Sequence, residues 1–402
     1  MKTTYCILIH YHEIALKGNN RSWFEWQLIK NIKYQFNNLP YKEINLKAAR
    51  IFCFGVDKSL WNQYQIRLKK ILGIRHAILM KEIKSEIDEI KLAAAEEIKD
   101  IDFNSFRIST KRQHKAFNFN SQEVNEIIGK YIQETYSKKV SLKNPNIDIK
   151  IEIVNGKTYL GFKRVLGYGG LPVKTSEQAL SMISSGIDSP VSSFEMLKRG
   201  VYLTYVHFHS APATNRQSIQ NVEEILSVLA GYQMRCKVYM VPLLEIQQKI
   251  MSEAPNKIWV ILFRRAMIKL ASKIADQLDI PALVSGESVG QVASQTLSNI
   301  RATSDAADRP ILRPLCGFNK DDIVNLADQI GTYKISIQPY DDCCSFFVPI
   351  HPETKAKMNY VLKKESEIDF KDMFNDALSQ AIEKVIEHSD YIKNNKMEKK
   401  SD

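Results

Sequence analysis

The stretch Leu180–Pro190, with the sequence LSMISSGIDSP, decides the fold expected for this chain. A short apolar run, Ala179–Ile183, ends in a polar loop, Ser184–Ser189. Pro190 then opens a helix-like segment, Val191–Arg199. Proline fits the first turn of a helix, where its missing N–H costs no hydrogen bond. The stretch therefore predicts a strand, a tight loop and a helix.

The loop between this strand and helix has the composition of a phosphate-binding turn. Gly186 can take backbone conformations that a side chain forbids. The serines beside it, Ser184, Ser185 and Ser189, add hydroxyl donors. The start of the helix, near Asp188, offers uncapped N–H groups and the positive end of the helix dipole. Such residues also make up ordinary strand-to-helix turns, so both interpretations stay open on this loop alone.

Strand-like and helix-like segments alternate from this stretch to about residue 330, which predicts an α/β domain with a doubly wound parallel sheet. Ligands of such sheets bind beyond the carboxyl ends of the strands. The expected strands are Ala179–Ile183, Val201–His207, Cys236–Val241, Ala282–Ser285 and Ile311–Arg313, and the expected helices are Val191–Arg199, Gln217–Leu229, Ile258–Leu278 and Asp321–Gln329.

Polar clusters follow four of these strands and should face one pocket, whose inventory fits a nucleotide better than a small metabolite. His207 and His209 lack a third ligand at a suitable spacing, so no metal site is predicted. Within an apolar helix pattern, Arg264 and Arg265 should place one guanidinium in the site and the other on the surface. The clusters are Ser184–Ser189, His207–His209, Ser285–Gln295 and Arg313-Pro314.

Positive charge is concentrated in one part of the chain, which has 402 residues and a formal net charge of +11. Residues 104–175 contain 13 lysines and arginines against five acidic residues, which accounts for +8 of that charge. A basic segment of this kind favours a polyanionic partner, nucleic acid above all. A solvated lysine-rich surface is the alternative.

Neither end of the chain nor its apolar runs predict a membrane contact. No run approaches the roughly 20 apolar residues that span a bilayer. The N-terminus is too polar after Ile9 to be a signal peptide. The sequence therefore predicts a cytoplasmic protein, and its length allows two or three domains.

The N-terminal 165 residues predict two small α+β units, 1–60 and 61–165, followed by a flexible linker at 166–172. In the second unit, KRQHKAFNFN interleaves cations with aromatic rings, an arrangement that can grip phosphates and stack on bases. An amphipathic strand end explains the same pattern. We expect a helix capped by Ser121 and a hairpin turning at Asn155-Gly156. The candidate RNA-binding residues are Lys111, Arg112, Lys115 and Phe117.

Six cysteines occur without CxxC spacing, and one adjacent pair, Cys343-Cys344, follows the polar segment Pro339–Asp342. Buried cysteines usually act as small apolar side chains. The polar, loop-borne context of this pair favours a reactive thiol.

Together these motifs resemble a known family. SSGIDSP is similar to the SGGxDS loop of PP-loop ATP pyrophosphatases. Four further segments narrow the resemblance to the ThiI family of tRNA uracil 4-sulfurtransferases, which is also linked to thiamine biosynthesis. The resemblance covers about residues 1–360. The segments are EIALKGNNR (Glu13–Arg21), ALVSGESVGQVASQT (Ala282–Thr296), ILRPLCGFNKDDI (Ile311–Ile323) and IGTYKISIQPYDDCC (Ile330–Cys344).

The resemblance implies a ferredoxin-like domain at 1–60, a tRNA-binding THUMP domain at 61–165 and an adenylating PP-loop domain at 173–392, with a basic tail at 393–402. ATP, with Mg²⁺, would adenylate C4 of uridine 8 in tRNA, and a persulfide sulfur would then displace AMP. Asp188 would place Mg²⁺ or pyrophosphate, Lys320 would stabilise phosphate charge, and Cys343 would handle sulfur, with Cys344 as a second thiol. ATP would contact Met182, Ile183, Ser184, Ser185, Gly186, Ser189, His207, Phe208, Arg264, Gly286 and Gln295.

The sequence departs from the family pattern in the loop, where Ser185 replaces a glycine and could crowd the pyrophosphate, and at His12, where the family usually has glycine. No rhodanese domain is expected after residue 360, only helices and the basic tail. A cysteine desulfurase would then supply the persulfide, and a thiamine sulfur-carrier protein is a further candidate partner. The oligomeric state, including a homodimer, stays open.

Two alternatives remain from the sequence. One is another PP-loop adenylating enzyme that acts on a small molecule, although the basic segment argues against it. The other is a tRNA-binding protein whose loop is impaired by Ser185.

Overall fold

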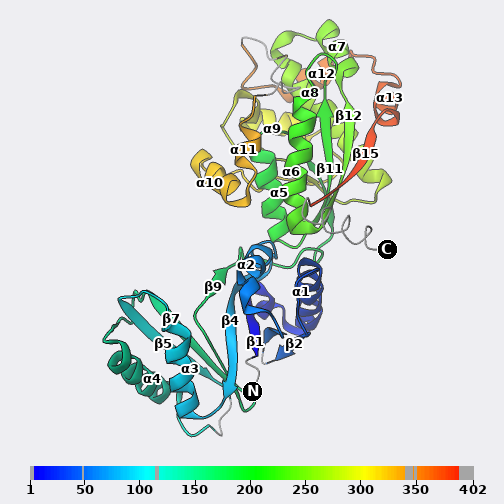
Figure 1. Ribbon diagram of the computed structural model, residues 1–402. Coiled ribbons are helices and arrows are strands. Elements are labelled where there is room, and N and C mark those ends of the chain that lie inside the picture. The colour runs from blue at the N-terminus through cyan, green and yellow to red at the C-terminus, as the bar shows by residue number, and fades with distance from the viewer. Residues whose placement is uncertain (1–3, 48, 114–116, 340–346, 348–350, 389–402) are drawn as a thin grey trace. The chain divides into compact units, whose positions relative to one another are not determined.

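The structure is a computed structural model that describes residues 4–47, 49–113, 117–339, 347 and 351–388. It consists of two compact units, Met1–Pro172 and Val173–Asp402, which are drawn in Figure 1. Among the described residues, no helix combines the length and the apolar character needed to cross a membrane.

The first unit is built on one sheet whose described strands run in the order β2-β3-β1-β4-β8-β7-β5-β6, with β9 also paired to β4. The strand β4 is the longest, with 11 residues, and pairs with β1 along one edge and with β8 and β9 along the other. The strands are β1 (Tyr5–Tyr11), β2 (Glu43–Lys47), β3 (Arg50–Phe54), β4 (Ile74–Lys84), β5 (Ser105–Arg112), β6 (Lys139–Val140), β7 (Ile147–Val154), β8 (Lys157–Gly161) and β9 (Arg164–Leu166).

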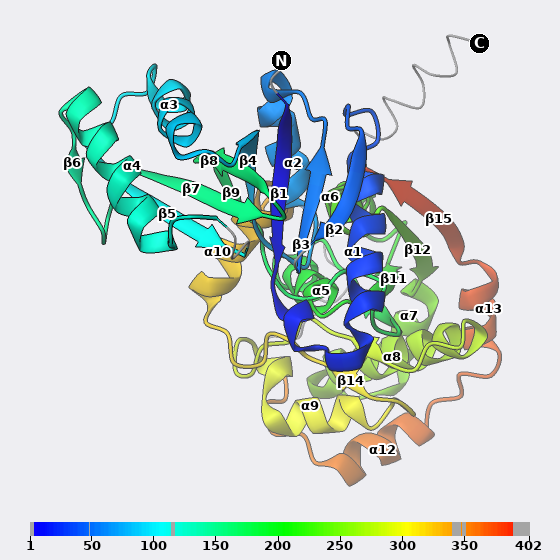
Figure 2. The same ribbon diagram turned by 90° about the horizontal axis from the view of Figure 1, so that it is seen from below.

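The helices α1 (Arg21–Gln35) and α2 (Trp61–Lys69) share an apolar cluster with one face of the β1–β4 part of this sheet, and Figure 2 shows α1 alongside these strands. Ile7 and Ile9 of β1 point into this cluster because alternate residues of a strand share a face. We expected the first α+β unit to end at residue 60, yet Trp61, Tyr64 and Leu68 belong to the same cluster.

The helices α3 (Ile87–Ile98) and α4 (Ser121–Tyr136) form a second cluster with β5, β7 and β8. The N-cap of α4 is Asn120, one residue before the expected Ser121. Asn120, not Ser121, accepts from the backbone N–H groups of Gln122 and Glu123, and the Glu123 carboxylate accepts from the Asn120 N–H in a capping box.

The second unit contains the expected doubly wound sheet, with the described strands in the order β14-β13-β10-β11-β12-β15. All neighbours are parallel except β12 and β15. The chain leaves the central strand β10 toward β11 and β12 and later returns on its other side as β13 and β14. The strands are β10 (Gln178–Met182), β11 (Tyr202–His209), β12 (Arg235–Pro242), β13 (Leu283–Val284), β14 (Ile311–Leu312) and β15 (Ile382–Glu387).

Helices cover both faces of this sheet, with α5 and α6 against one and α8 and α13 against the other (Figure 1). The cluster under α8 includes Leu180, Val206 and Phe263. The helices are α5 (Asp188–Lys198), α6 (Gln217–Gln233), α7 (Leu244–Glu253), α8 (Trp259–Gln277), α9 (Leu297–Ser304), α10 (Lys320–Ile330), α11 (Tyr333–Ser336), α12 (Met358–Ser366) and α13 (Met373–Ser379), with short 3-10 turns η4 (Asn256–Ile258) and η5 (Ala293–Gln295).

One element after residue 360 corrects the sequence expectation of helices alone. Residues 382–387 form β15, which pairs antiparallel with β12 from Met240↔Ile382 to Arg235↔Glu387. Its sequence, IEKVIE, mixes charges with β-branched residues and suits a half-covered edge strand. The basic tail at 393–402 lies outside the described residues.

Candidate functional site

A cavity of about 570 Å³ opens at the carboxyl end of the central strand β10, in the second unit. This is the place where the strand order reverses, and open α/β sheets bind ligands there. Its lining combines apolar side chains, such as Met182 and Phe208, with polar ones, as a nucleotide base and its phosphates require. Its lining includes Met182, Ile183, Ser184, Gly186, Asp188, Ser189, His207, Phe208, Lys257, Val260, Ile261, Arg264, Met267, Ile268, Gly286, Glu287, Ser294, Gln295, Pro352 and Glu353.

The loop between β10 and α5 is closed by hydrogen bonds between its two ends. The Ser184 N–H donates to Ser189 Oγ at 2.9 Å, and Ser189 Oγ donates to the Ser184 carbonyl at 3.1 Å. The helix α5 then begins at Asp188, with Pro190 in its first turn. The loop therefore holds the helix N-terminus, with its positive dipole end, at the cavity.

Ser185, which raised the question of crowding, does not line the cavity. It is 1% exposed, and its hydroxyl has no hydrogen-bond partner among the described residues. The extra side chain relative to Ser-Gly-Gly loops is therefore buried in the protein rather than placed in the ligand space.

Asp188 lines the cavity and pairs with Lys320, which does not itself line it. Lys320 Nζ lies 2.6 Å from Asp188 Oδ1, and Gln291 Nε2 donates to Asp188 Oδ2 at 2.9 Å. Asp188 is the first residue of α5 and Lys320 the first of α10. A lysine is unfavourable at the positive end of a helix dipole, so its ammonium needs a negative neighbour. Asp188 supplies one, and an anionic ligand would supply another.

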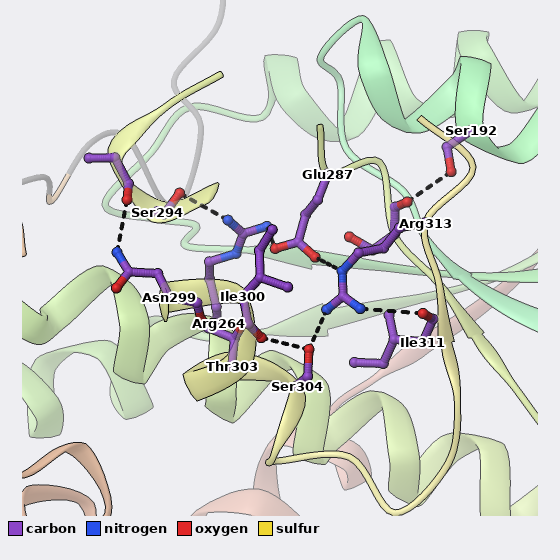
Figure 3. A network of polar contacts seen from close by, with 12 residues as sticks. Ser192, Arg264, Glu287, Ser294, Asn299, Ile300, Thr303, Ser304, Ile311 and Arg313 are labelled. Atoms are coloured by element: carbon purple, nitrogen blue, oxygen red, sulfur yellow. Dashed lines mark hydrogen bonds and ion pairs between the residues drawn. The ribbon is translucent and has the colours of Figure 1, made fainter. Parts of the chain in front are cut away.

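A carboxylate between two arginines forms the polar core of the site, and Figure 3 shows Glu287 between the guanidinium groups of Arg264 and Arg313. Glu287 Oε1 lies 2.8 Å from Arg264 and Oε2 lies 2.5 Å from Arg313 Nε. The Glu287 side chain is only 4% exposed. Burial alone would raise the pKa of this carboxyl, but the two guanidiniums outweigh burial and hold its pKa below the usual value.

Arg264 is oriented from two sides. Besides Glu287, its Nη1 donates to Ser294 Oγ at 2.9 Å. The sequence led us to expect Arg265 on the surface, and this prediction was wrong. Arg265 is 2% exposed and donates to Glu365, to Asp305 and to the Ala302 carbonyl, because its position in α8 faces α9 and α12 instead of the solvent.

Two buried polar atoms of cavity-lining residues have no partner among the described residues: His207 Nε2 and Gln295 Oε1. His207 Nδ1 lies 3.0 Å from the Ile183 carbonyl, so Nδ1 carries the proton and Nε2 is an acceptor. Burial lowers the pKa of His207 to about 4, which keeps the ring neutral at pH 7. Buried polar atoms are rarely left unpaired, so both acceptors indicate a ligand with N–H donors.

Gly286 allows the segment after β13 to approach the start of α5. A Cβ at this position would lie 2.8 Å from both the N and the Cα atom of Ser189. Only glycine fits this approach, which brings Glu287 beside the phosphate-binding loop.

The candidate RNA-binding residues lie in the first unit. Lys111 and Arg112 end β5, where Lys111 is exposed and Arg112 Nη1 donates to the Phe117 carbonyl at 2.8 Å. Phe117 packs against the apolar cluster of α3 and α4, which favours the amphipathic-strand explanation for that ring. Lys115 lies outside the described residues.

Further cations surround two stacked histidines on the same sheet, His10 and His76, whose ring centroids are 4.5 Å apart. Burial, with the nearby positive charges of Arg50, Lys111 and Arg164, lowers the pKa of His10 to about 3. Burial and Arg164 lower the pKa of His76 to about 4. Glu152 offsets part of this charge, because it pairs with Arg50 at 3.1 Å, and burial keeps both imidazole rings neutral at pH 7.

Cys343 and Cys344 lie outside the described residues. Among the described cysteines, Cys6, Cys53 and Cys236 are buried and Cys316 is partly exposed. Burial raises the pKa of Cys53 to about 12, which makes this thiol a poor nucleophile.

The sequence placed Glu287, Gln291, Ser294 and Arg313 in clusters that follow predicted strands, but it did not predict their roles. The pairing of Glu287 with Arg313 at one sheet edge was a possible inference, because both follow strands. The partners of Gln291 and Ser294, which are Asp188 and Arg264, left no signal because each lies distant in the sequence.

Comparison with known proteins covers nearly the whole chain. Residues 174–370 match the family described as Thiamine biosynthesis protein (ThiI), residues 84–163 match the THUMP domain, and residues 6–77 match the ThiI ferredoxin-like domain. A probable tRNA sulfurtransferase of Caldanaerobacter subterraneus is 38% identical over 378 residues, which covers 94% of this chain and 99% of that protein. One of Bacillus pumilus is 38% identical, with 94% and 95% covered.

Solved structures agree with these matches. The crystal structure of a 4-thiouridine synthetase in complex with RNA and with bound ATP has a TM-score of 0.84 and 32% identity, covering 95% of this chain and 100% of that one. The crystal structure of PH1313 from Pyrococcus horikoshii has a TM-score of 0.60 and 22% identity, covering 81% and 99%, which supports the fold alone.

Proposed function

The chain belongs to the ThiI family of tRNA sulfurtransferases, and on this premise we propose that it is an ATP-dependent enzyme that converts uridine 8 of tRNA to 4-thiouridine. The observation that carries the proposal is the cavity at the end of β10, which joins the loop before α5, two acceptors that are unpaired among the described residues, and Arg264 held by the buried carboxylate of Glu287. Relatives that match 94% of the chain are named tRNA sulfurtransferases.

The chemistry needs three steps. Uracil O4 is a poor leaving group, so it first attacks the α-phosphate of ATP and releases pyrophosphate. The outer sulfur of a persulfide then attacks C4, AMP leaves, and the base is joined to the carrier cysteine through an S–S bond. A second thiol attacks the carrier sulfur, which releases 4-thiouridine and leaves a disulfide that a dithiol reductant must reduce before the next turnover. Donors and positive charge placed around the phosphates stabilise the charge that develops in the first step. The start of α5, Lys320 and Arg264 are placed to supply them.

The base pocket favours adenine. His207 Nε2 and Gln295 Oε1 are acceptors, and the exocyclic amino group of adenine has two N–H donors. Guanine presents a carbonyl oxygen at that position, which would leave an acceptor facing an acceptor. Phe208 and Met182 provide apolar surface for the ring. We assign Ile183, Ser184, Gly186, Ser189 and Gly286 to the phosphate side.

Mg²⁺ fits this site as a partner of the phosphates. The described residues hold no group of three His, Cys, Asp or Glu side chains able to bind a metal ion alone. Mg²⁺ needs no such group, because it commonly uses one or two carboxylates together with phosphate oxygens. Asp188 would be that carboxylate, and the bound ion would neutralise charge on the leaving pyrophosphate.

Sulfur handling rests on the resemblance to the family. We propose that Cys343 carries the persulfide, that a cysteine desulfurase loads it, and that Cys344 is the thiol that releases the product. A thiamine sulfur-carrier protein is a second acceptor that we propose at family level only, and a homodimer is proposed on the same basis.

The first unit provides the RNA-binding part in this proposal. We retain Lys111, Arg112 and Lys115 as RNA contacts, supported by the exposure of Lys111 and by the charge of +8 over residues 104–175, whereas Phe117 packs in the apolar cluster of α3 and α4. We propose a ferredoxin-like part that extends beyond the sequence-based boundary at residue 60 into β4, because Trp61, Tyr64 and Leu68 pack in its cluster. The THUMP part then reaches residue 165 and the PP-loop part spans 173–392. We also propose a cytoplasmic location, where tRNA is found.

The proposal is tested by nucleoside analysis of tRNA from a strain that lacks this protein. We expect 4-thiouridine to be absent and to return with the wild-type gene but not with Cys343→Ser. A purified reaction with tRNA, ATP and Mg²⁺, cysteine, a cysteine desulfurase and a dithiol reductant checks that the activity is direct. Persistence of 4-thiouridine in the deletion strain would refute the assignment, whereas normal activity of Cys343→Ser would refute only the sulfur carrier.

The alternative of a tRNA-binding protein with an impaired loop leads to a prediction at Ser185. We expect Ser185→Ala to raise the free energy of unfolding by about 1 kcal/mol, because it removes a buried hydroxyl without a partner. Since this side chain does not line the cavity, the KM for ATP should stay within about twofold of wild type, as for any change outside the binding contacts. Urea unfolding and steady-state kinetics give the two values. A large fall in KM for Ser185→Ala would mean that Ser185 does obstruct the phosphates.

A further inference from the structure

One wall of the nucleotide cavity comes from a segment far along the chain from the loop and its strands. Pro352 and Glu353 line the cavity together with Ala293, Ser294 and Gln295 of η5. The two parts of this wall are more than fifty residues apart in sequence. Something must therefore hold one against the other.

Asn299, in the first turn of α9, makes this connection with its side chain. Its Nδ2 donates to the Ala293 carbonyl at 2.8 Å and to the Glu353 carbonyl at 2.7 Å, and its Oδ1 accepts from the Ala356 N–H at 3.1 Å. The residue is 0% exposed. A buried primary amide that uses both N–H groups and its oxygen on three backbone groups fixes all three in place.

Two neighbouring contacts reinforce the same connection. Thr296 Oγ1 caps α9 by accepting from the Asn299 N–H and donates to the Thr354 carbonyl at 2.7 Å. The Glu353 N–H donates to the carbonyl of Lys257, which also lines the cavity. Residues 353–356 are thus held through their backbone, whatever their own side chains are.

The effect reaches the nucleotide through Arg264. Ala293, whose carbonyl accepts from the Asn299 side chain, is the first residue of η5. The hydroxyl of the next residue, Ser294, accepts from Arg264 Nη1. Figure 3 shows Asn299 near Ser294, which lies beside Arg264. Any movement of η5 therefore shifts the hydroxyl that orients this guanidinium.

We propose that Asn299 is a positioning residue for ATP, which holds the Glu353–Ala356 segment against η5 and so sets the width of the cavity and the orientation of Arg264. This inference rests on the proposed function for the identity of the nucleotide. It adds a residue that touches neither the substrate nor the reacting atoms.

The test compares Asn299→Ala and Asn299→Asp with a matched control, Thr303→Val. Thr303 lies one turn further along α9, is 0% exposed, and bonds only the carbonyls of Asn299 and Ile300 within that helix. The loss of the Thr303 hydroxyl weakens the same helix but removes no bond to the cavity wall. Aspartate keeps the shape of asparagine and the bond from Ala356, but turns a carboxylate oxygen toward two carbonyls.

Two readouts separate positioning from stability: the dissociation constant of a non-hydrolysable ATP analogue and the melting temperature. We expect the dissociation constant to rise about tenfold or more in Asn299→Ala, and at least as much in Asn299→Asp, as for the loss of a preorganising contact. Thr303→Val should lower the melting temperature but leave the dissociation constant within about twofold. Its hydroxyl bonds the backbone carbonyls of Asn299 and Ile300, whereas the bonds to the cavity wall come from the Asn299 side chain and stay intact.

The inference fails if Asn299→Ala binds the analogue like wild type, or if Thr303→Val weakens binding as much. Should Asn299→Ala not fold, Thr296→Val removes the bond to Thr354 together with the α9 cap that accepts from the Asn299 N–H, and it should still weaken binding severalfold. Unchanged binding in that variant would also contradict the inference. Because binding of the analogue needs no tRNA or sulfur, a wild-type protein that binds it but makes no 4-thiouridine would refute the proposed function and leave this test intact.

Discussion

Glu287→Gln is expected to lower the free energy of unfolding by about 3–5 kcal/mol, the cost typical of breaking a buried ion pair. The substitution keeps the shape of the side chain and removes the charge that compensates Arg264 and Arg313, whose side chains are 20% and 13% exposed. The new amide group would also direct N–H donors at a guanidinium. Urea unfolding at pH 7, with an unchanged denaturant slope, measures this loss.

The same substitution should raise the KM for ATP more than about tenfold, because Arg264 loses the anchor that keeps it beside the phosphates. Glu365→Gln is the matched control. Glu365 accepts from Arg265 and pairs with Lys269 in a similarly buried setting, but it does not line the cavity. It should destabilise the protein and leave the KM unchanged. A normal KM in Glu287→Gln would mean that this carboxylate only supports the fold.

Asp188→Asn and Lys320→Gln are each expected to reduce tRNA-dependent AMP formation by about a hundredfold to a thousandfold, as for the removal of a preorganised charge at a transition state. Asp188→Asn removes the proposed Mg²⁺ ligand, and Lys320→Gln removes a cation placed at the phosphates. Both side chains are partly exposed, so little stability should be lost. AMP is measured by chromatography in the presence and absence of tRNA.

The double variant tells whether the two residues act as a unit. If both serve the same pyrophosphate, the double variant should be hardly worse than either single one, since residues that work together are not additive. Lys198→Gln, at the far end of α5 and paired with Glu195, is the control and should be fully active. Independent, multiplying losses would argue that Asp188 and Lys320 serve different steps.

The second unit was largely predictable from the sequence because its strands are buried on both faces. Parallel strands such as β11, YLTYVHFH, read as nearly continuous apolar runs, and the helices between them have a clear period. The edge strand β15 was missed because IEKVIE carries three charges and has one neighbour instead of two. A strand is therefore easier to predict from the sequence when both of its faces are buried, because its residues are then nearly all apolar.

The candidate site was predictable where a residue's role depends on its place after a strand. Asp188 and Gly286 follow strands, His207 lies near the carboxyl end of β11, and all three line the cavity. Arg265 was misplaced because the sequence does not reveal that Glu365, a hundred residues away, covers that side of α8. The role of Asn299 could not be predicted from the sequence, because its partners are backbone carbonyls and every residue type has one.

The strand β4 has a consequence for how the N-terminal modules can be exchanged between proteins. The ferredoxin-like match ends at residue 77 and the THUMP match begins at residue 84, so the junction falls inside β4. Both halves of the sheet are bonded to this one strand. A graft or a recombination that separates the two modules must therefore supply a new strand in place of β4. Transfer of the two modules together needs no such strand.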